Sequence, residues 1–203
     1  VAGYAFSIWG LIYLGMVAHA GYQVWHGARS PTSPGLVWAS VAAMIGCGAW
    51  IIAAALNGVW ATVAILSASA LVMILALIDA PRPTRPAEMW CVRTPLSVLA
   101  GWLTIAAIVN VLTSLTIAGV LGPAQAQAGA LAAIAFAVLI ATFVAWRARN
   151  AIYLAPIAWG LGGVYVAEMA VKPVVANVAL GAALALLAWA LVVARRERAA
   201  ASR

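Results

Sequence analysis

Apolar runs of about twenty residues, separated by short polar or Pro/Gly-rich breaks, dominate this 203-residue sequence. A helix needs about 20 apolar residues to cross the hydrocarbon core of a bilayer, because each residue advances it by about 1.5 Å. Hydrophobic residues make up 67% of the chain and charged residues only 7%, whereas soluble domains carry roughly a quarter charged residues. The sequence therefore predicts an all-α, polytopic membrane helix bundle.

The breaks divide the chain into about seven transmembrane helices. We expect them at residues 4–25, 36–56, 61–79, 95–118, 127–146, 151–171 and 174–194. The boundary between the second and third rests on Asn57-Gly58, a turn signal inside a continuous apolar run. Because the sequence starts without a methionine and close to an apolar run, we expect an eighth helix upstream of Val1.

The arginines test this helix count independently, because cytoplasmic loops of membrane proteins collect Lys and Arg. If seven helices alternate in direction, ten arginines fall on one side and Lys172 alone falls on the other. The ten are Arg29, Arg82, Arg85, Arg93, Arg147, Arg149, Arg195, Arg196, Arg198 and Arg203. We expect the C-terminus in the cytoplasm and the chain in a bacterial cytoplasmic membrane. Single scattered arginines favour lipid headgroups over nucleic acid as partners.

Recognisable catalytic or metal-binding patterns do not occur in the sequence. It contains no hydrolase triad, phosphate loop, nucleotide fingerprint or paired-carboxylate site. Cys47 and Cys91 stand far apart and form no metal-ligand spacing. His19 is expected to be a hydrogen-bonded structural residue, and Glu168 to pair with Lys172 one helical turn later. We therefore predict no catalytic residue and no metal site, and leave open whether the protein is an enzyme.

Aromatic and amide side chains recur at helical spacing inside the apolar runs. Phe6, Trp9 and Tyr13 share one face of the first helix, and Trp102 and Asn110 share one face of the fourth. Asn57 precedes Trp60 by three residues, which brings their side chains together on one helix face. Packing between helices and contact with a ligand both remain open for these faces.

Three short motifs in these segments occur in order along the chain. They are Gly3-Tyr-Ala-Phe-Ser-Ile-Trp9-Gly-Leu-Ile-Tyr13, Leu56-Asn57-x-x-Trp60 and Trp102-x-x-x-Ala106-x-x-x-Asn110. Together they resemble the TspO/translocator protein family, the tryptophan-rich sensory proteins. The resemblance implies that residues 1–118 correspond to family helices two to five. Residues 119–203 would then add three transmembrane helices and a basic cytoplasmic tail, as in a longer, divergent member.

The resemblance also implies a ligand site. Family members bind porphyrins, haem-like tetrapyrroles and in some cases sterols in a pocket among these helices. On this basis the expected ligand-binding residues are Phe6, Trp9, Tyr13, Asn57, Trp60, Trp102 and Asn110. The implied ligand is a tetrapyrrole or another apolar molecule, such as a pigment. Ser7-Ile8 replaces the family's proline-containing pair before the tryptophan, so the porphyrin breakdown associated with bacterial members is not carried over.

Two other functions remain open alongside ligand binding. The chain could be an accessory or structural subunit of a larger bioenergetic or photosynthetic membrane complex. Its possible protein partners are the subunits of such a complex or a second copy of this chain. A transporter would need buried ionisable groups or a polar path, for which the sequence supplies only His19 and Glu168.

Overall fold

The computed structural model describes residues 2–201, and over that range it is helical throughout apart from short connections. The long helices are α1 (Ile8–His26), α2 (Pro34–Ala55), α3 (Val59–Asp79), α5 (Thr94–Ile117), α6 (Ala126–Ala148), α7 (Leu154–Glu168) and α8 (Pro173–Ala201). Short segments are the 3-10 turns η1 (Gly3–Ser7) and η2 (Gly27–Arg29), the turn α4 (Pro86–Glu88) and the π-helical turn η3 (Met89–Arg93). The prediction of an all-α helix bundle is confirmed.

Six of these helical stretches are long and apolar enough to cross a membrane within the described residues. The stretches are Gly3–His26, Pro34–Ala55, Val59–Asp79, Pro86–Ile117, Ala126–Ala148 and Pro173–Arg198. The remaining long helix, α7, has only 15 residues and is therefore roughly 22 Å long. It is shorter than the predicted 151–171, because turns occupy both ends of that range.

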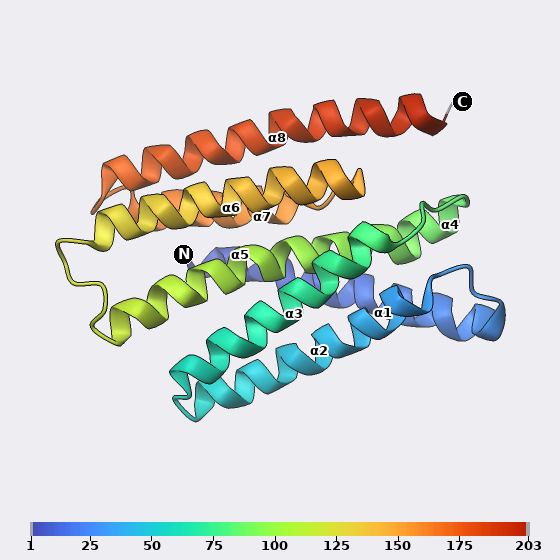
Figure 1. The fold of residues 1–203 in the computed structure, drawn as a ribbon, viewed down its shortest axis with the longest axis horizontal. Coiled ribbons are helices and arrows are strands. Elements are labelled where there is room, and N and C mark those ends of the chain that lie inside the picture. The colour runs from blue at the N-terminus through green and yellow to red at the C-terminus, as the bar shows by residue number, and fades with distance from the viewer. Residues whose placement is uncertain (1, 202–203) are drawn as a thin grey trace.

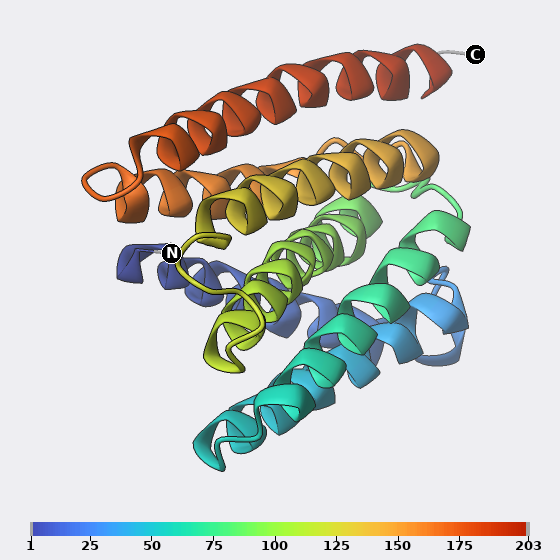
Figure 2. The ribbon, with the colours of Figure 1, turned by 60° about the vertical axis from the view of Figure 1, so that its left-hand side comes forward.

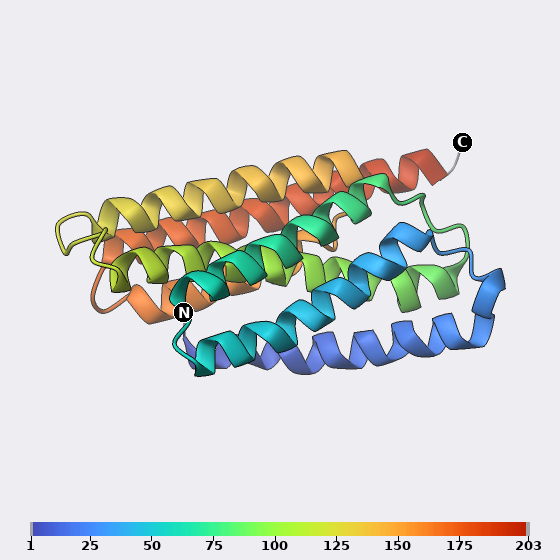
Figure 3. The same cartoon turned by 60° about the horizontal axis from the view of Figure 1, so that its bottom comes forward.

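Helix α5 is the central element of the bundle, since it packs against α1, α3, α6 and α7. Figure 1 shows α8 on one outer side, α6 and α7 beneath it, and α2 with α3 on the opposite side. Figure 2 shows the same order from another direction, with α5 between the two groups. In Figure 3 all the long helices run roughly along one axis, as expected for a bundle that crosses a bilayer.

Local chemistry sets several helix ends. Ser33 caps α2, its hydroxyl oxygen accepting a hydrogen bond from the Leu36 amide at 3.4 Å, and Pro34 occupies the first turn. Asn57 turns the chain between α2 and α3 in the left-handed region (φ 55°), which asparagine tolerates better than most residues. The predicted Asn57-Gly58 break is therefore a real turn, and α3 begins at Val59, slightly earlier than expected.

Two predicted loop or tail segments are helical instead. The helix expected to start at residue 95 is continuous with α4 and η3 and starts at Pro86. The charged residues of 86–93 suggested a loop, but Glu88 and Arg93 are buried among neighbouring helices. The basic tail after residue 194 continues α8 to Ala201, since alanines and arginines favour a helix.

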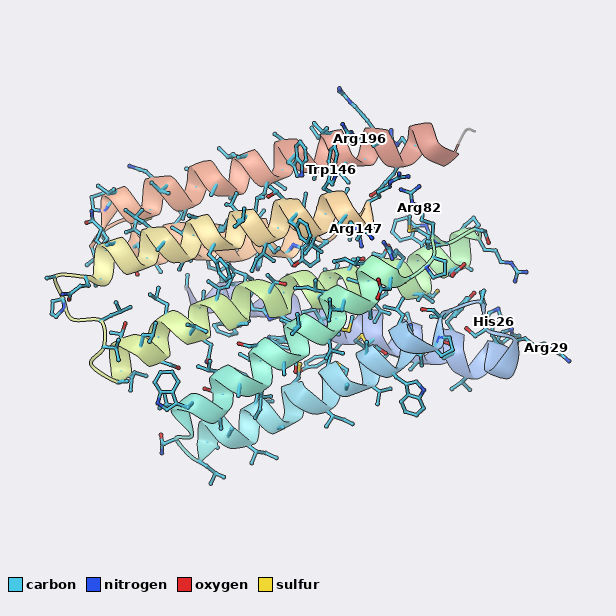
Figure 4. The ribbon with its side chains drawn as sticks, in the orientation of Figure 1. His26, Arg29, Arg82, Trp146, Arg147 and Arg196 are labelled. Carbon is cyan, nitrogen blue, oxygen red and sulfur yellow. The ribbon has the colours of Figure 1, made fainter. Side chains whose placement is uncertain are left out.

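The arginines gather at one end of the bundle, as their alternation predicts. The connections 27–33 and 80–85 and the end of α8 lie together on the right of Figure 1. Figure 4 places Arg29, Arg82, Arg147 and Arg196 at this same end, which we call the arginine-rich end. Arg203 lies outside the described residues.

Candidate ligand cavity

An aromatic cavity of about 180 Å³ lies among η1, α1, α2, α3, α5 and α7. It is lined by Phe6, Trp9, Cys47, Trp50, Leu66, Trp102, Ile105, Ala106, Val109, Asn110, Thr113 and Gly160. Half of the lining residues come from α5, the central helix, so the shape of the cavity depends on how the surrounding helices pack against α5. Gly160 matters for this packing, because a Cβ there would lie 2.9 Å from Ile105 Cγ1.

Three aromatic rings meet at one side of the cavity. Trp102 is buried, and the rings of Phe6 and Trp9 pack against its ring in edge-to-face arrangements, with centroids 6.1 and 6.4 Å away. Edge-to-face pairs at this distance are a favourable arrangement of aromatic rings. Tyr13 stacks on the outer side of Trp9 at 5.5 Å. The cavity therefore offers ring edges and faces to a flat apolar molecule.

The polar groups of the cavity are few. The indole nitrogens Nε1 of Trp50 and Trp102 are both buried, and within the described chain neither has a hydrogen-bond partner. Asn110 is half-buried, and its Oδ1 accepts a hydrogen bond from the Thr62 hydroxyl at 3.2 Å. A buried N–H without a partner costs free energy that a bound acceptor would recover.

The structure brings four of the seven predicted ligand-binding residues to this cavity. Phe6, Trp9, Trp102 and Asn110 line it. Tyr13 contacts it only through its stack on Trp9.

The other two predicted residues, Asn57 and Trp60, do not line the cavity. Both are exposed at the turn between α2 and α3. The left-handed backbone at Asn57 places it outside the helix, so the helical spacing of the pair does not direct both side chains inward. Thr62, in the first turn of α3, makes the contact with Asn110 instead.

Sequence reasoning missed the contribution of α2. Trp50 and Cys47 are three residues apart on this helix, and both line the cavity. Their spacing is an available signal, but a tryptophan near the end of an apolar helix is equally typical of a membrane interface. Thr113 extends the face of Asn110 by a further turn.

A larger cavity of about 520 Å³ opens between α3, α5 and α6. Its wall is aliphatic except for Phe136, Ser67 and Thr104, and the Thr104 hydroxyl is already hydrogen-bonded to Tyr153 at 2.7 Å. Phe136 and Leu71 on its rim are more than half exposed. The larger cavity therefore has almost no free polar group, whereas the smaller cavity has the indole N–H groups of Trp50 and Trp102 and the side chain of Asn110.

Two expectations outside the cavity are confirmed. His19 is buried and lies 3.3 Å from the Ser40 hydroxyl on α2, as expected for a hydrogen-bonded structural histidine. Glu168 and Lys172 form an ion pair of 3.7 Å across one helical turn.

The fold and cavity define a helical membrane protein with an aromatic cavity inside the bundle. The family model described as TSPO-like protein matches residues 1–192, so the chain belongs to the TSPO-like family. The match continues past residue 118 and includes α6, α7 and most of α8. Neither a curated protein nor a solved structure matches the chain significantly.

Proposed function

We propose that this TSPO-like membrane protein binds a flat, apolar molecule with a hydrogen-bond acceptor in the aromatic cavity. The observation that carries the proposal is the pair of buried indole N–H groups of Trp50 and Trp102, which have no partner in the described chain and belong to cavity-lining residues. An acceptor on the ligand would satisfy one of them, while Phe6 and Trp9 contact its rings.

The size of the cavity bears on the class of ligand. Ligand pockets commonly measure about 300–1,000 Å³, and this cavity measures about 180 Å³. A fused two-ring molecule suits this volume, whereas a tetrapyrrole would insert one edge and leave the rest toward the lipid. Phe6 lines the cavity and is 51% exposed, so we expect the larger ligand to emerge beside it.

Orientation and cellular location belong to the proposal as well. We place the arginine-rich end in the cytoplasm of a bacterial cell, because cytoplasmic loops collect arginine. The surrounding lipid is then the main partner, and homodimers or larger assemblies use the exposed apolar helix faces.

A titration of purified protein in neutral detergent tests the proposal. Protoporphyrin, haem and 2-acetylnaphthalene are added in turn, and binding is followed through the absorbance or fluorescence of each ligand. We expect saturable binding of at least one of them. Trp9→Leu should weaken it about fivefold, since one ring contact contributes on the order of 1 kcal/mol.

The matched control is Trp25→Leu, because Trp25 lies at the far end of α1 with 88% of its surface exposed. It should bind as the wild type does. Absence of saturable binding for all three ligands, or equal losses in both variants, would refute the proposal. The role of accessory subunit in a larger membrane complex would then be the better hypothesis.

A further inference from the structure

A third cavity, of about 450 Å³, lies at the arginine-rich end of the bundle. Its walls come from the connection after α3, from η3, from the turn after α6 and from the end of α8. The lining residues are Arg82, Pro83, Thr84, Met89, Arg93, Arg149, Asn150, Ile152 and Glu197. Figure 4 shows Arg82 next to the ends of α4 and α6, on the same side as Arg147 and Arg196.

Positive charge predominates in this cavity. Three guanidinium groups and the single carboxylate of Glu197 line it, which leaves two excess positive charges. Glu197 Oε1 accepts a hydrogen bond from the Ala151 amide at 2.8 Å. Within residues 2–201 no carboxylate lies within 4.0 Å of any of these arginines. The charge is therefore not neutralised by an ion pair in the described chain.

The innermost arginine is fixed by helix ends. Arg93 is 4% exposed, and its guanidinium donates to the carbonyl oxygens of Leu77 at 3.2 Å and Ala148 at 2.8 Å. Leu77 and Ala148 belong to the last turns of α3 and α6, where carbonyls lack partners within their own helix. Arg93 thus provides a fixed positive charge in the cavity, and its hydrogen bonds hold it in place without a ligand.

Arg149 occupies a backbone position that favours glycine. It follows the last residue of α6 with φ 46° and ψ 64°, the left-handed conformation that commonly ends a helix. A residue with a Cβ is less stable there than glycine, because the Cβ comes too close to the following carbonyl oxygen. Arg149 is one of the residues that line the cavity, and backbone strain tends to persist where a residue has a function.

We propose that this cavity is a binding site for a phosphate-type anion. Guanidinium groups pair with phosphate oxygens through two parallel N–H bonds, and Arg82 and Arg149 supply such groups around the fixed charge of Arg93. The anion is either the headgroup of an acidic phospholipid or a free phosphate, since both present the same oxygens at the membrane surface.

The variant Arg82→Gln/Arg149→Gln tests the site, because both side chains are exposed and hold no helix end. The control Arg147→Gln/Arg195→Gln removes the same charge at the same end from residues that do not line the cavity. In the lipid arm, native mass spectrometry counts phosphatidylglycerol and phosphatidylcholine retained by each protein. In the free-anion arm, the unfolding temperature of each protein in maltoside detergent is measured at increasing concentrations of inorganic phosphate.

We expect one arm to show selective, saturable binding that the cavity variant weakens on the order of tenfold or more and the control leaves unchanged. The arm that responds identifies the source of the phosphate. A third variant, Arg149→Gly, should raise the unfolding temperature, because glycine relieves the strain of the left-handed backbone. The same variant should weaken binding of the anion. No binding in either arm, or equal loss in the cavity and control variants, would overturn the proposal.

Discussion

Trp159 on α7 donates its indole N–H to the carbonyl oxygen of Ala5, 2.9 Å away and 154 positions earlier in the chain. Tyr4 packs edge-on against the same indole, with ring centroids 5.4 Å apart. The Ala2 amide also donates to the Gly163 carbonyl at 3.0 Å. These contacts fasten η1 to α7 and thereby hold Phe6 over Trp102 in the aromatic cavity. The second half of the chain thus positions part of the candidate site.

The variant Trp159→Phe should loosen η1 without unfolding the bundle. It removes the N–H donor but keeps a ring beside Tyr4, so the expected loss is about 1 kcal/mol of local stability. Amide hydrogen exchange in residues 3–7 should accelerate about fivefold, because local opening controls exchange. Trp25→Phe is the control and should leave this exchange unchanged. Unaltered exchange in Trp159→Phe would show that η1 is held by other contacts.

Gly101 should be the least replaceable glycine between α5 and α7. A Cβ there would collide with the Tyr153 carbonyl oxygen and lie 2.5 Å from Pro156 Cγ. Gly101→Ala should therefore force the helices apart and cost about 1–3 kcal/mol, seen as a lower unfolding temperature in detergent. At Gly162 a Cβ would meet no heavy atom within 4 Å. Gly162→Ala should be neutral or slightly stabilising, and a similar loss in both variants would contradict the packing argument.

Arg93 should be a strong determinant of stability at the arginine-rich end. Arg93→Met keeps the apolar stem but removes the donors to Leu77 and Ala148. Two buried carbonyls lose a partner, so we expect a loss of roughly 3 kcal/mol, measured by thermal unfolding. Arg85→Met is the control, because Arg85 is exposed. Equal stability of the two variants would mean that water or lipid replaces the lost hydrogen bonds.

The helix pattern was accessible to sequence reasoning because the bilayer fixes the length of an apolar run. The connections, by contrast, depend on contacts between distant residues. Residues 86–93 carry charges and suggested a loop, yet Arg93 is satisfied by carbonyls from α3 and α6. Spacing within one segment cannot reveal such partners. The same dependence on distant partners explains why the start of α5 was misplaced.

The residues of the candidate cavity could be predicted only in part from the sequence, for a related reason. Trp9 and Trp102 were found because each belongs to a motif on a regular helix, where spacing fixes the face. Asn57 and Trp60 straddle a left-handed turn, so helical spacing misdirects the prediction. Trp50 was missed because an isolated tryptophan on an apolar helix has the same pattern whether it faces lipid or a neighbour.

The orientation of the bundle is testable by cysteine labelling in intact bacterial cells. In a Cys91→Ala background, with Cys47 buried, Thr84→Cys and Arg147→Cys report on the arginine-rich end. We expect a membrane-impermeant reagent to label them only after the cells are permeabilised, whereas Ala124→Cys at the opposite end should react directly. Labelling of Thr84→Cys from outside would reverse the proposed topology.

The indole nitrogen of Trp102 should determine which ligands the aromatic cavity prefers. Trp102→Phe keeps an aromatic ring against Phe6 and Trp9 but removes the buried N–H that lacks a partner in the described chain. The sensitive probe is a pair of ligands with the same shape, 2-acetylnaphthalene and 2-ethylnaphthalene, of which only the first has a carbonyl acceptor.

The wild type should bind the ketone more tightly by about fivefold to tenfold, since one hydrogen bond contributes about 1 kcal/mol or slightly more. In Trp102→Phe the ratio of the two affinities should fall toward one. The hydrocarbon should bind almost as before, because the ring contacts remain. Fluorescence titration of both ligands against both proteins measures the ratio directly, and any general weakening of the cavity cancels from it. An unchanged ratio would assign the acceptor contact to another donor, and Trp50→Phe would then be expected to abolish the preference instead.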